Sequence, residues 1–323
     1  MTTTAVRPEN RPTSLEPGRL KIADRTFRIV ALACGLLVLA ILALIAIFMT
    51  NQAWPAFTRA GFHFITSRDW DPNTNHFGAL AFIYGTLGIS LIALVFAVPV
   101  SLGIALFLTE VAPLRLRTPV VYVIDLLAAI PSVVFGLWGI LALQTPLGKF
   151  YGHVSSFFSG VPVLDRIFRG NAGRSFFTAG IIVALMITPI ITSLTREVFA
   201  TVPRSQKEAA LALGATRWEM MRTSILGYGR SGVVGAVMLG LGRAMGETIA
   251  VALVIGSIPS ISLSLFHPGD AMAAVIANQF GEASGAFRAA LIGLGVVLFA
   301  MTIVINIVAR GFVSRAERAT GRA

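Results

Sequence analysis

The feature that most constrains this chain is a series of long apolar runs separated by polar stretches. An α-helix rises about 1.5 Å per residue, so about 20 apolar residues cross the ~30 Å hydrocarbon core of a bilayer. Only 13% of the 323 residues are charged, which is about half of the share that is usual in soluble domains. The sequence therefore predicts an all-α, polytopic membrane protein, because helical spans satisfy their backbone hydrogen bonds internally.

The apolar runs predict six transmembrane helices. Proline residues inside the second, third and fourth runs predict kinks or breaks there. The predicted spans are residues 29–48, a stretch within 79–108, 120–143, 176–194, 233–255 and 287–308. The chain is accordingly divided into an N-terminal tail, 1–27, a transmembrane domain, 28–313, and a C-terminal tail, 314–323.

Three connecting segments carry their own expectations. Residues 51–77 mix polar and aromatic side chains, a composition that predicts an interfacial helix and a loop. Residues 144–175 are predicted to form a long polar loop. Residues 256–286 are rich in Ser, Pro, Gly and Asn, and are predicted to form a loop with a short or re-entrant helix at 271–280.

The distribution of basic residues predicts the orientation of the chain. Six spans place both termini on one side of the membrane. With the tails inside, eighteen Lys and Arg residues face the cytoplasm and six face outward. Positive residues are enriched on the cytoplasmic side, so both termini are predicted to be cytoplasmic. The net charge of +11 is then explained by the flanks of the spans, and no nucleic-acid partner is needed.

A polar stretch at 203–230, PRSQKEAALALGATRWEMMRTSILGYGR, is predicted to be a cytoplasmic coupling loop between the fourth and fifth spans. It reads as two short helices, at 204–213 and about 216–226, joined at Gly214. Ala, Leu and Met would be exposed there among charges, which fits recognition of a helix in a groove. An ordinary amphipathic connector on the membrane surface explains the same pattern, and the residues alone leave both open.

Arg243 and Glu247 form the second candidate site, because they lie inside the predicted fifth span. They are four residues apart and would share a helix face, although Arg before Glu is the less favourable order. A charge near the bilayer centre costs at least ~2.5 to 3.5 kcal/mol, so both should face protein or a wet cavity. Three interpretations stay open: a lock between helices, an oxyanion contact, or a gate. Gly240, Gly242 and Gly246 would allow close packing or leave room for a path.

Other motifs restrict what the chain does by itself. It has no GxxxxGK followed by Ser or Thr, so it should not hydrolyse ATP. Its four histidines are scattered without metal-ligand spacing, and no metal site is expected. The lone Cys34 excludes an internal disulfide.

The polar stretch at 203–230, hereafter the docking stretch, resembles the EAA motif of ABC importer permeases. That motif is written E-A-A, three residues, G, nine residues, I-x-L-P. Glu208, Ala209, Ala210, Gly214 and Leu226 fall in register. The sequence departs from the motif at Ser224 and Gly227, where isoleucine and proline are usual. In that family the loop inserts into a cleft of the ATP-hydrolysing subunit, which implies ATPase docking by Glu208, Ala209, Ala210, Gly214, Arg217 and Trp218.

The segments IPSVVFGLWGI (130–140), MITPIITSLTREVF (186–199) and GAVMLGLGRAMGETIAVALVIG (235–256) resemble phosphate importer permeases of the PstC type. The resemblance covers about 78–313. It implies a type I ABC importer permease fold with six spans in the cytoplasmic membrane of a bacterium. It also implies that Arg243 and Glu247 belong to the translocation path or its gate.

The same resemblance implies a set of partners. These are a second, PstA-like permease subunit, two ATP-binding subunits and an extracytoplasmic phosphate-binding protein. ATP and Mg would be bound by the ATP-binding subunits, and no cofactor is expected in this chain. An ABC permease for sulfate or molybdate is an alternative, as is an ion-coupled carrier or channel without an ATPase.

Overall fold

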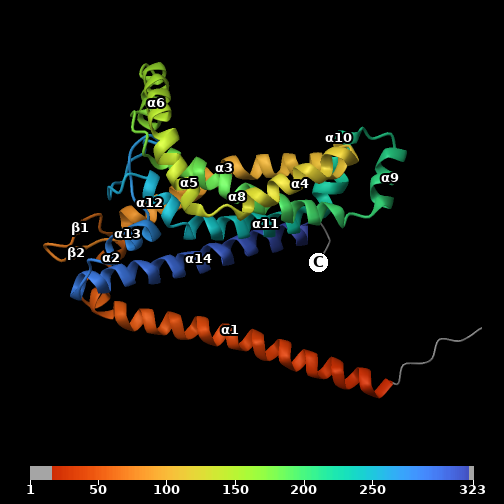
Figure 1. The fold of residues 1–323 in the computed structure, drawn as a ribbon, viewed down its shortest axis with the longest axis horizontal. Helices are drawn as coiled ribbons and strands as arrows, with labels where there is room; N and C mark the ends of the chain where they lie inside the picture. Colours follow the sequence, from red (N-terminus) through yellow and green to blue (C-terminus); the bar gives the residue numbers. More distant parts are fainter. Residues whose placement is uncertain (1–16, 320–323) are drawn as a thin grey trace, which may run out of the picture. The chain divides into compact units, whose positions relative to one another are not determined.

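The structure is a computed structural model that describes residues 17–319, with the burial of side chains described for residues 24–311. The described chain is helical except for loops and one small hairpin (Figure 1). It divides into two compact units, of which the first ends at Asn51 and the second begins at Gln52. The predicted tails, 1–27 and 314–323, fall partly outside the described residues, and the predicted domain boundaries stay a prediction.

The first helix, α1 (Pro17–Ala60), is 44 residues long. It begins before the predicted start of the first span and includes residues that were expected to belong to the tail. The apolar side chains of its first-unit part are exposed, Leu36, Leu39 and Leu44 among them. Such a continuous apolar surface is suited to lipid or to a partner chain.

The second unit contains the other elements. A β-hairpin of β1 (Trp70–Asp71) and β2 (His76–Phe77) follows α2 (His63–Thr66). The helices that follow are α3 (Leu80–Leu106), α4 (Leu114–Ala129), α5 (Ser132–Trp138), α6 (Gln144–Phe158), α7 (Pro162–Phe168), α8 (Phe176–Ala200), α9 (Arg204–Ala212), α10 (Arg217–Met220), α11 (Leu226–Gly246), α12 (Ile249–Val254), α13 (Met272–Gln279) and α14 (Gly285–Ala319), with π-helical turns η1 (Phe107–Val111), η2 (Gly139–Leu143) and η3 (Met221–Ile225).

Six helical stretches of the described chain are long and apolar enough to cross a membrane, as predicted. They are Asp24–Ala60, Leu80–Val111, Ser132–Phe158, Phe176–Ala200, Arg217–Gly246 and Gly285–Gly311. The short helix expected at 271–280 is also present as α13. The number of spans is therefore confirmed, whereas the bounds of the third and fifth differ from the prediction.

The third span, predicted at 120–143 with a kink or break at its proline, is divided there, but its predicted bounds are wrong. Helix α4 ends at Ala129, and Ile130 and Pro131 both have extended backbone before α5 begins. Proline has no N–H to donate and disfavours helical backbone in the preceding residue, which accounts for the break. The break was anticipated at Pro131, but the helical segment that follows it is much longer than expected.

The prediction of a polar loop at 144–175 is also wrong, because α6 and α7 occupy most of it. Tyr151 of α6 is fully buried, stacks on Phe266 with ring centroids 4.1 Å apart, and shares a hydrogen bond with Thr178. Figure 1 shows α6 projecting from the bundle rather than running along it. The polar composition of 144–175 therefore reflects a helix that is exposed along much of its surface.

The predicted fifth span, 233–255, is wrong at both ends. One continuous helical run, α10–η3–α11, extends from Arg217 to Gly246, and a separate α12 follows. The expected second docking helix at 216–226 therefore does not end but continues into the span. Gly227 stands where the EAA motif has proline, and a glycine does not force the helix to stop there.

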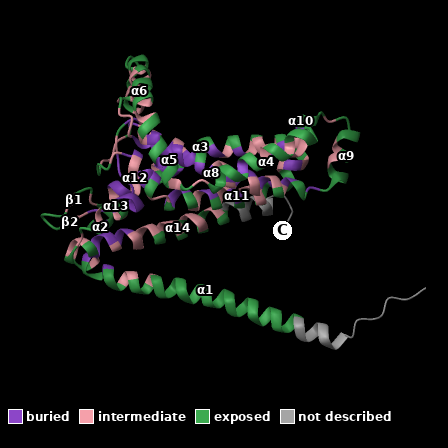
Figure 2. Ribbon diagram, viewed as in Figure 1, coloured by how far each residue is buried: buried purple, intermediate pink, exposed green. Residues whose placement is uncertain are grey.

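The main core lies between α3, α8, α11 and α12, with α5 packed against it. Ile89, Ile182, Ile187, Ile191 and Val251 are buried there. Glycine allows the close approach: a Cβ on Gly180 would lie 2.4 Å from Ile92 of α3. Figure 2 shows the buried residues gathered in this part of the bundle, while α6 and α9 are largely exposed. The core holds the ends of α11 and α12 in place and so positions the candidate site.

Candidate functional site

The first candidate site is an interruption between α11 and α12. Helix α11 ends at Gly246, and Glu247 has extended backbone with ψ 127°. Thr248 precedes α12, and its hydroxyl donates to the carbonyl of Gly246 at 3.0 Å. Non-helical backbone at membrane depth is tolerated only where it is buried in protein or lines a wet cavity. The polar backbone at the interruption must therefore be surrounded by protein or line a wet cavity.

Arg243 and Glu247 lie on the two sides of this interruption. Arg243 is in the last turn of α11 and is exposed, whereas Glu247 is half-buried. The expectation that they share one face of a continuous helix is wrong, because the helix ends between them. Among the described residues no ion pair within 4.0 Å involves either side chain. The lock between helices through this pair is thus not formed within the described chain.

The interruption also explains the order of the two charges. A cation is favourable near a helix C-terminus and an anion near a helix N-terminus. Arg243 stands at the end of α11, and Oε1 of Glu247 accepts a hydrogen bond from the backbone N–H of Ala250, at 3.4 Å, in the first turn of α12. Arg before Glu is unfavourable within one helix, but it is favourable here, because Arg243 lies at the C-terminus of α11 and Glu247 at the N-terminus of α12.

The glycines around the interruption have two different roles. A Cβ on Gly240 would lie 2.7 Å from Ile191 of α8, so Gly240 allows close packing. No heavy atom lies within 4 Å of the Cβ positions of Gly242 and Gly246, so these two face open space. Open space beside Arg243 leaves its guanidinium accessible to a partner chain or an anion.

Helix α5 packs directly against α12. A Cβ on Gly136 of α5 would lie 2.9 Å from Cα of Ala250, and one on Gly139, the first residue of η2, would lie 2.8 Å from Val254. The stretches 130–140 and 235–256, which are far apart in the sequence, therefore meet in space. Each contains a helix interruption, and the halves that follow the two interruptions form a common packing surface.

The second candidate site is the docking stretch, in which α9 and α10 are joined at Gly214. Pro203 precedes α9, and Gly214 has φ +85°, a conformation that glycine adopts without strain. A capping box begins α10: the Thr216 hydroxyl accepts from the N–H of Glu219, and the Glu219 carboxylate accepts from the N–H of Thr216 at 2.8 Å. The predicted turn at Gly214 is confirmed.

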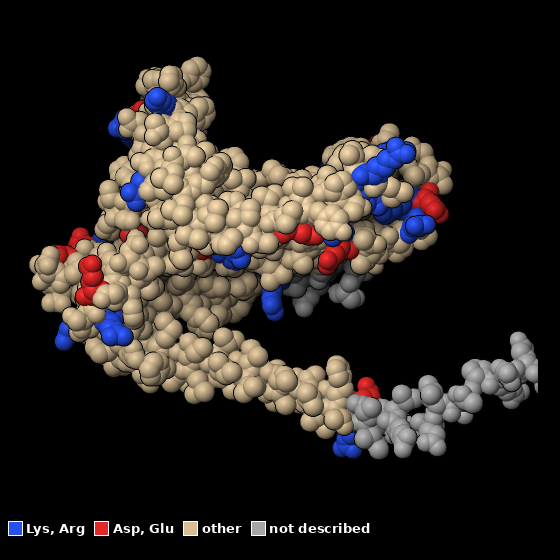
Figure 3. Space-filling view, viewed as in Figure 1, with Lys and Arg blue, Asp and Glu red and all other residues tan. Residues whose placement is uncertain are grey.

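The docking stretch exposes apolar side chains among charges. Leu213 is 90% exposed and Trp218 is 61% exposed. Glu208, Ala209, Gly214 and Arg217 are also exposed, whereas Ala210 is half-buried. Figure 3 shows Lys and Arg side chains gathered over this end of the molecule. Exposed leucine and tryptophan on a polar element are typical of a surface that another protein covers.

The docking stretch is anchored by a small apolar cluster of its own. Met220 and Ile225 are buried against Ala105 of α3 and Phe199 of α8, and Ala210 of α9 packs against the same group. The two candidate sites lie at opposite ends of one helical run. Trp218 and Arg243 are 25 positions apart, which corresponds to about 37 Å of helix. The structure therefore links the two sites through α11 without bringing them together.

Several polar residues of interest lie outside the two candidate sites, and the sequence indicates only Asp125 among them, as a residue of helix packing or of the path. Asp270 is 2% exposed in the loop before α13. Asp125, Thr192 and Arg196 line one narrow gap between α4 and α8, and the Thr192 hydroxyl is buried without a partner in the described chain. Lys207 pairs with Glu110 of η1. None of these contacts has a sequence signal, because each joins residues that are distant in the chain.

Known proteins of related sequence place the chain in a class. Residues 97–321 match the family described as binding-protein-dependent transport system inner membrane component. Three relatives named phosphate transport system permease protein PstC, one of them PstC 2, align over most of their length. Those from Mesorhizobium japonicum, Pasteurella multocida and Mycobacterium tuberculosis are 43%, 43% and 42% identical, covering 94%, 97% and 89% of this chain and 94%, 99% and 90% of the relative.

Solved structures support the same class at the level of fold. A bacterial ABC transporter involved in the import of alginate aligns with a TM-score of 0.59 at 18% identity, covering 92% of this chain and 98% of that one. The inward-facing MetNI methionine ABC transporter aligns with a TM-score of 0.52 at 16% identity, covering 72% and 94%. The fold is that of the membrane subunit of a type I ABC importer. Within that class, the chain belongs to the family of the phosphate transport system permease proteins PstC.

Proposed function

We propose that this chain is one of two membrane subunits of an ATP-driven importer that moves inorganic phosphate across the cytoplasmic membrane. The observation that carries the proposal is the alignment with proteins named phosphate transport permease over nearly the whole of both chains. No bond of phosphate is broken in this chain. Its task is to open a path alternately to the two sides while ATP is hydrolysed on another subunit.

The docking stretch is the proposed contact with the ATP-binding subunits. Leu213 and Trp218 would fill apolar sites of the partner, and Glu208 and Arg217 would make polar contacts at the rim. Ala209, Ala210 and Gly214 would allow close approach. ATP and Mg would be bound by that partner, and this chain would need no cofactor. Movement of the stretch would reach α11 directly, because α10, η3 and α11 are one helical run.

Arg243 and Glu247 are the proposed residues of the path or its gate. The guanidinium is always charged and presents several donors in a plane, which suits a phosphate oxyanion. Glu247 would repel the anion and so prevent tight trapping beside Arg243. The helix interruption supports this role, because polar backbone there needs a wet cavity or protein around it.

The remaining partners and the orientation follow from the same proposal. A second, PstA-like permease subunit would cover the exposed apolar faces together with lipid, and two ATP-binding subunits would contact the pair. An external phosphate-binding protein would rest on the outer loops. Both termini would be cytoplasmic, on the side of the basic docking stretch.

Phosphate uptake tests the proposal in cells that lack their own high-affinity system and express the whole importer. Arg243→Gln and Glu247→Gln should each lower uptake by about tenfold or more, which corresponds to at least about 1.4 kcal/mol of lost stabilisation. Arg288→Gln is the matched control, because Arg288 is also exposed but contacts the ring of Phe280 at 5.0 Å. Membrane abundance and pull-down of the ATP-binding subunits are measured for each variant.

Three outcomes would contradict the proposal in different ways. Uptake that persists in both variants would remove the pair from the path. Uptake of sulfate or molybdate by the wild-type importer without uptake of phosphate would favour a permease for another oxyanion. Phosphate movement by the purified chain alone in vesicles would favour a carrier or channel without an ATPase.

A further inference from the structure

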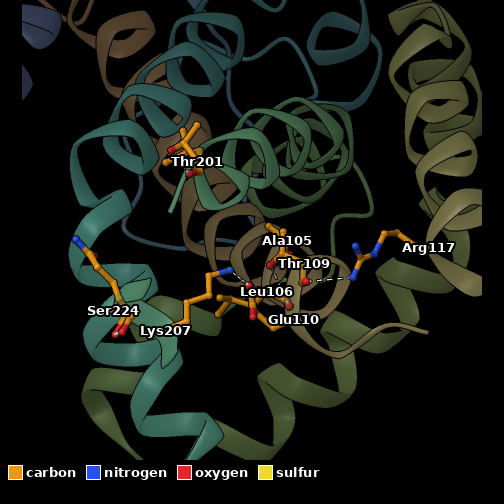
Figure 4. Close-up of polar contacts among 10 residues, drawn as sticks. Ala105, Leu106, Thr109, Glu110, Arg117, Thr201, Lys207 and Ser224 are labelled. Atoms are coloured by element: carbon orange, nitrogen blue, oxygen red, sulfur yellow. Dashed lines mark hydrogen bonds and ion pairs between the residues drawn. The ribbon is translucent and has the colours of Figure 1, made fainter. Parts of the chain in front are cut away.

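The docking stretch is joined to α3 by an ion pair between Lys207 and Glu110. Lys207 lies in the first half of α9, and Glu110 lies in η1, the π-helical turn that ends the run of α3. Nζ of Lys207 donates to Oε1 of Glu110 at 2.5 Å. The two side chains are 21% and 14% exposed. Figure 4 shows them pointing toward one another across the space between the two elements.

This contact stands out because α9 has few other polar links to the membrane helices. Ala210 packs against the apolar cluster. The carbonyl of Gln206 accepts a hydrogen bond from the Ser224 hydroxyl at 3.3 Å, but Ser224 itself belongs to the docking stretch. Among the described residues no other ion pair connects residues 203–230 with the rest of the chain. The pair therefore provides a charge-assisted link between α9 and α3.

The turn at Glu110 is itself a junction. The hydroxyl of Thr109 donates to the carbonyl of Ala105 at 3.0 Å, and the carbonyl of Thr109 accepts from Nη2 of Arg117, on α4, at 3.1 Å (Figure 4). Wide π-helical turns occur frequently at functional sites, because they leave backbone groups available to side chains. One turn thus holds the docking helix through Glu110 and α4 through Thr109.

From η1 the contact continues into the membrane part. Helix α3 packs along α8, with Ile89 and Ala93 in the shared core, and the Ser101 hydroxyl donates to the carbonyl of Thr188 at 3.1 Å. A displacement of α9 that keeps the ion pair would therefore move the end of α3, and α8 with it. This link is separate from the helical run that joins α10 to α11.

We propose that Lys207 and Glu110 are positioning residues that couple the docking stretch to α3, so that ATP-driven movement reaches the α3–α8 pair as well as α11. The inference rests on the proposed function, because it requires an ATP-binding subunit on the docking stretch. Neither residue contacts phosphate. Both act through the helices that they join.

The alternative is an ion pair that only stabilises the fold and has no role in coupling. Exposed pairs contribute little, and removing one partner of a partly buried pair destabilises by leaving the other charge unpaired. A merely stabilising pair would change how much complex assembles. A coupling pair would change how much phosphate moves for each ATP hydrolysed, in complex that has assembled normally.

The test uses the whole importer in vesicles, with the binding protein and phosphate on the side that the outer loops face. Phosphate uptake and ATP hydrolysis are measured in the same sample. Glu110→Gln should lower the ratio of phosphate moved to ATP hydrolysed by about fivefold or more, the low end of typical coupling between sites. The double variant Glu110→Lys with Lys207→Glu should restore most of the ratio. Asp165→Asn is the matched control, because it breaks the ion pair between Asp165 of α7 and Arg169, the residue that follows α7.

Each outcome either supports or overturns the coupling role of the Lys207–Glu110 pair. An unchanged ratio in Glu110→Gln overturns the inference, and so does a double variant that fails to raise the ratio above that of Glu110→Gln. If Glu110→Gln assembles poorly and the double variant restores assembly without the ratio, the pair is only stabilising. Failure of the proposed function looks different, because then the wild-type complex itself either binds no ATP-binding subunit or moves no phosphate.

Discussion

Asp270 is a carboxyl group that the fold buries where the loop before α13 packs on α3. Its Oδ1 accepts from the N–H of Ala271 at 2.8 Å, and a Cβ on Gly85 would lie 1.8 Å from its backbone carbonyl. Burial raises the pKa of Asp270 from 3.8 to about 7, and the hydrogen bond from Ala271 opposes that shift only in part. The neutral form is therefore the one that the fold favours.

This burial predicts how stability depends on pH. The unfolded chain releases the Asp270 proton near pH 3.8, whereas the folded chain keeps it until about pH 7, so stability falls as pH rises through this window. Asp270→Asn should be more stable than wild type at pH 8 by up to about 4 kcal/mol, with the difference vanishing toward pH 4. Melting of the detergent-purified chain measures this. Asp69→Asn, at an exposed position, is the control, and parallel pH curves for wild type and Asp270→Asn would contradict the assignment.

At the scale of the element, the contact of α11 with α8 depends on small residues in α11. Gly240 and Ala244 are buried on the side of α8, while Gly235 faces open space on the same helix. In lipid there is no hydrophobic force that drives two helices together, so close van der Waals packing carries the association. The packing holds α11 firmly up to the interruption at Glu247.

Two matched substitutions test this packing. Gly240→Val should destabilise the purified chain by about 1–3 kcal/mol, because the new side chain would overlap Ile191. Gly235→Val changes the same residue type in the same helix at a position where a Cβ meets nothing within 4 Å, so it should not lower the melting temperature. Equal melting temperatures for the two variants would show that α11 and α8 do not pack as described.

At the scale of the whole molecule, the distribution of exposed apolar and charged residues decides how the chain meets its surroundings. The exposed large apolar side chains lie mainly on the spans, and the basic docking stretch lies at one end of α11. The positive-inside rule predicts that this end is cytoplasmic, in line with the proposed orientation. With that orientation, the loop between α6 and α7 is expected to lie outside.

Labelling of engineered cysteines tests this orientation in a Cys34→Ser background, since Cys34 is the only cysteine. In intact cells a membrane-impermeant maleimide should label Ser159→Cys at once, and Leu213→Cys only after the membrane is opened. Bound ATP-binding subunits should slow the labelling of Leu213→Cys by about tenfold or more, as expected for a side chain buried at the centre of an interface. The reverse pattern of labelling would place the docking stretch outside.

The lengths of the apolar runs determined the all-α class and the number of spans, because crossing a bilayer requires a local run of apolar residues. The turn at Gly214 followed from local chemistry in the same way. The proline at 131 indicated a kink or break there, whereas no local pattern located the interruption at Glu247–Thr248. Composition did not reveal α6, because an exposed helix and a polar loop have similar compositions. Only the tertiary structure decided that Arg243 and Glu247 lie at two helix ends, that α5 packs on α12, and that Lys207 pairs with Glu110. These arrangements depend on how distant parts of the chain pack in space, and no local sequence pattern contains that information.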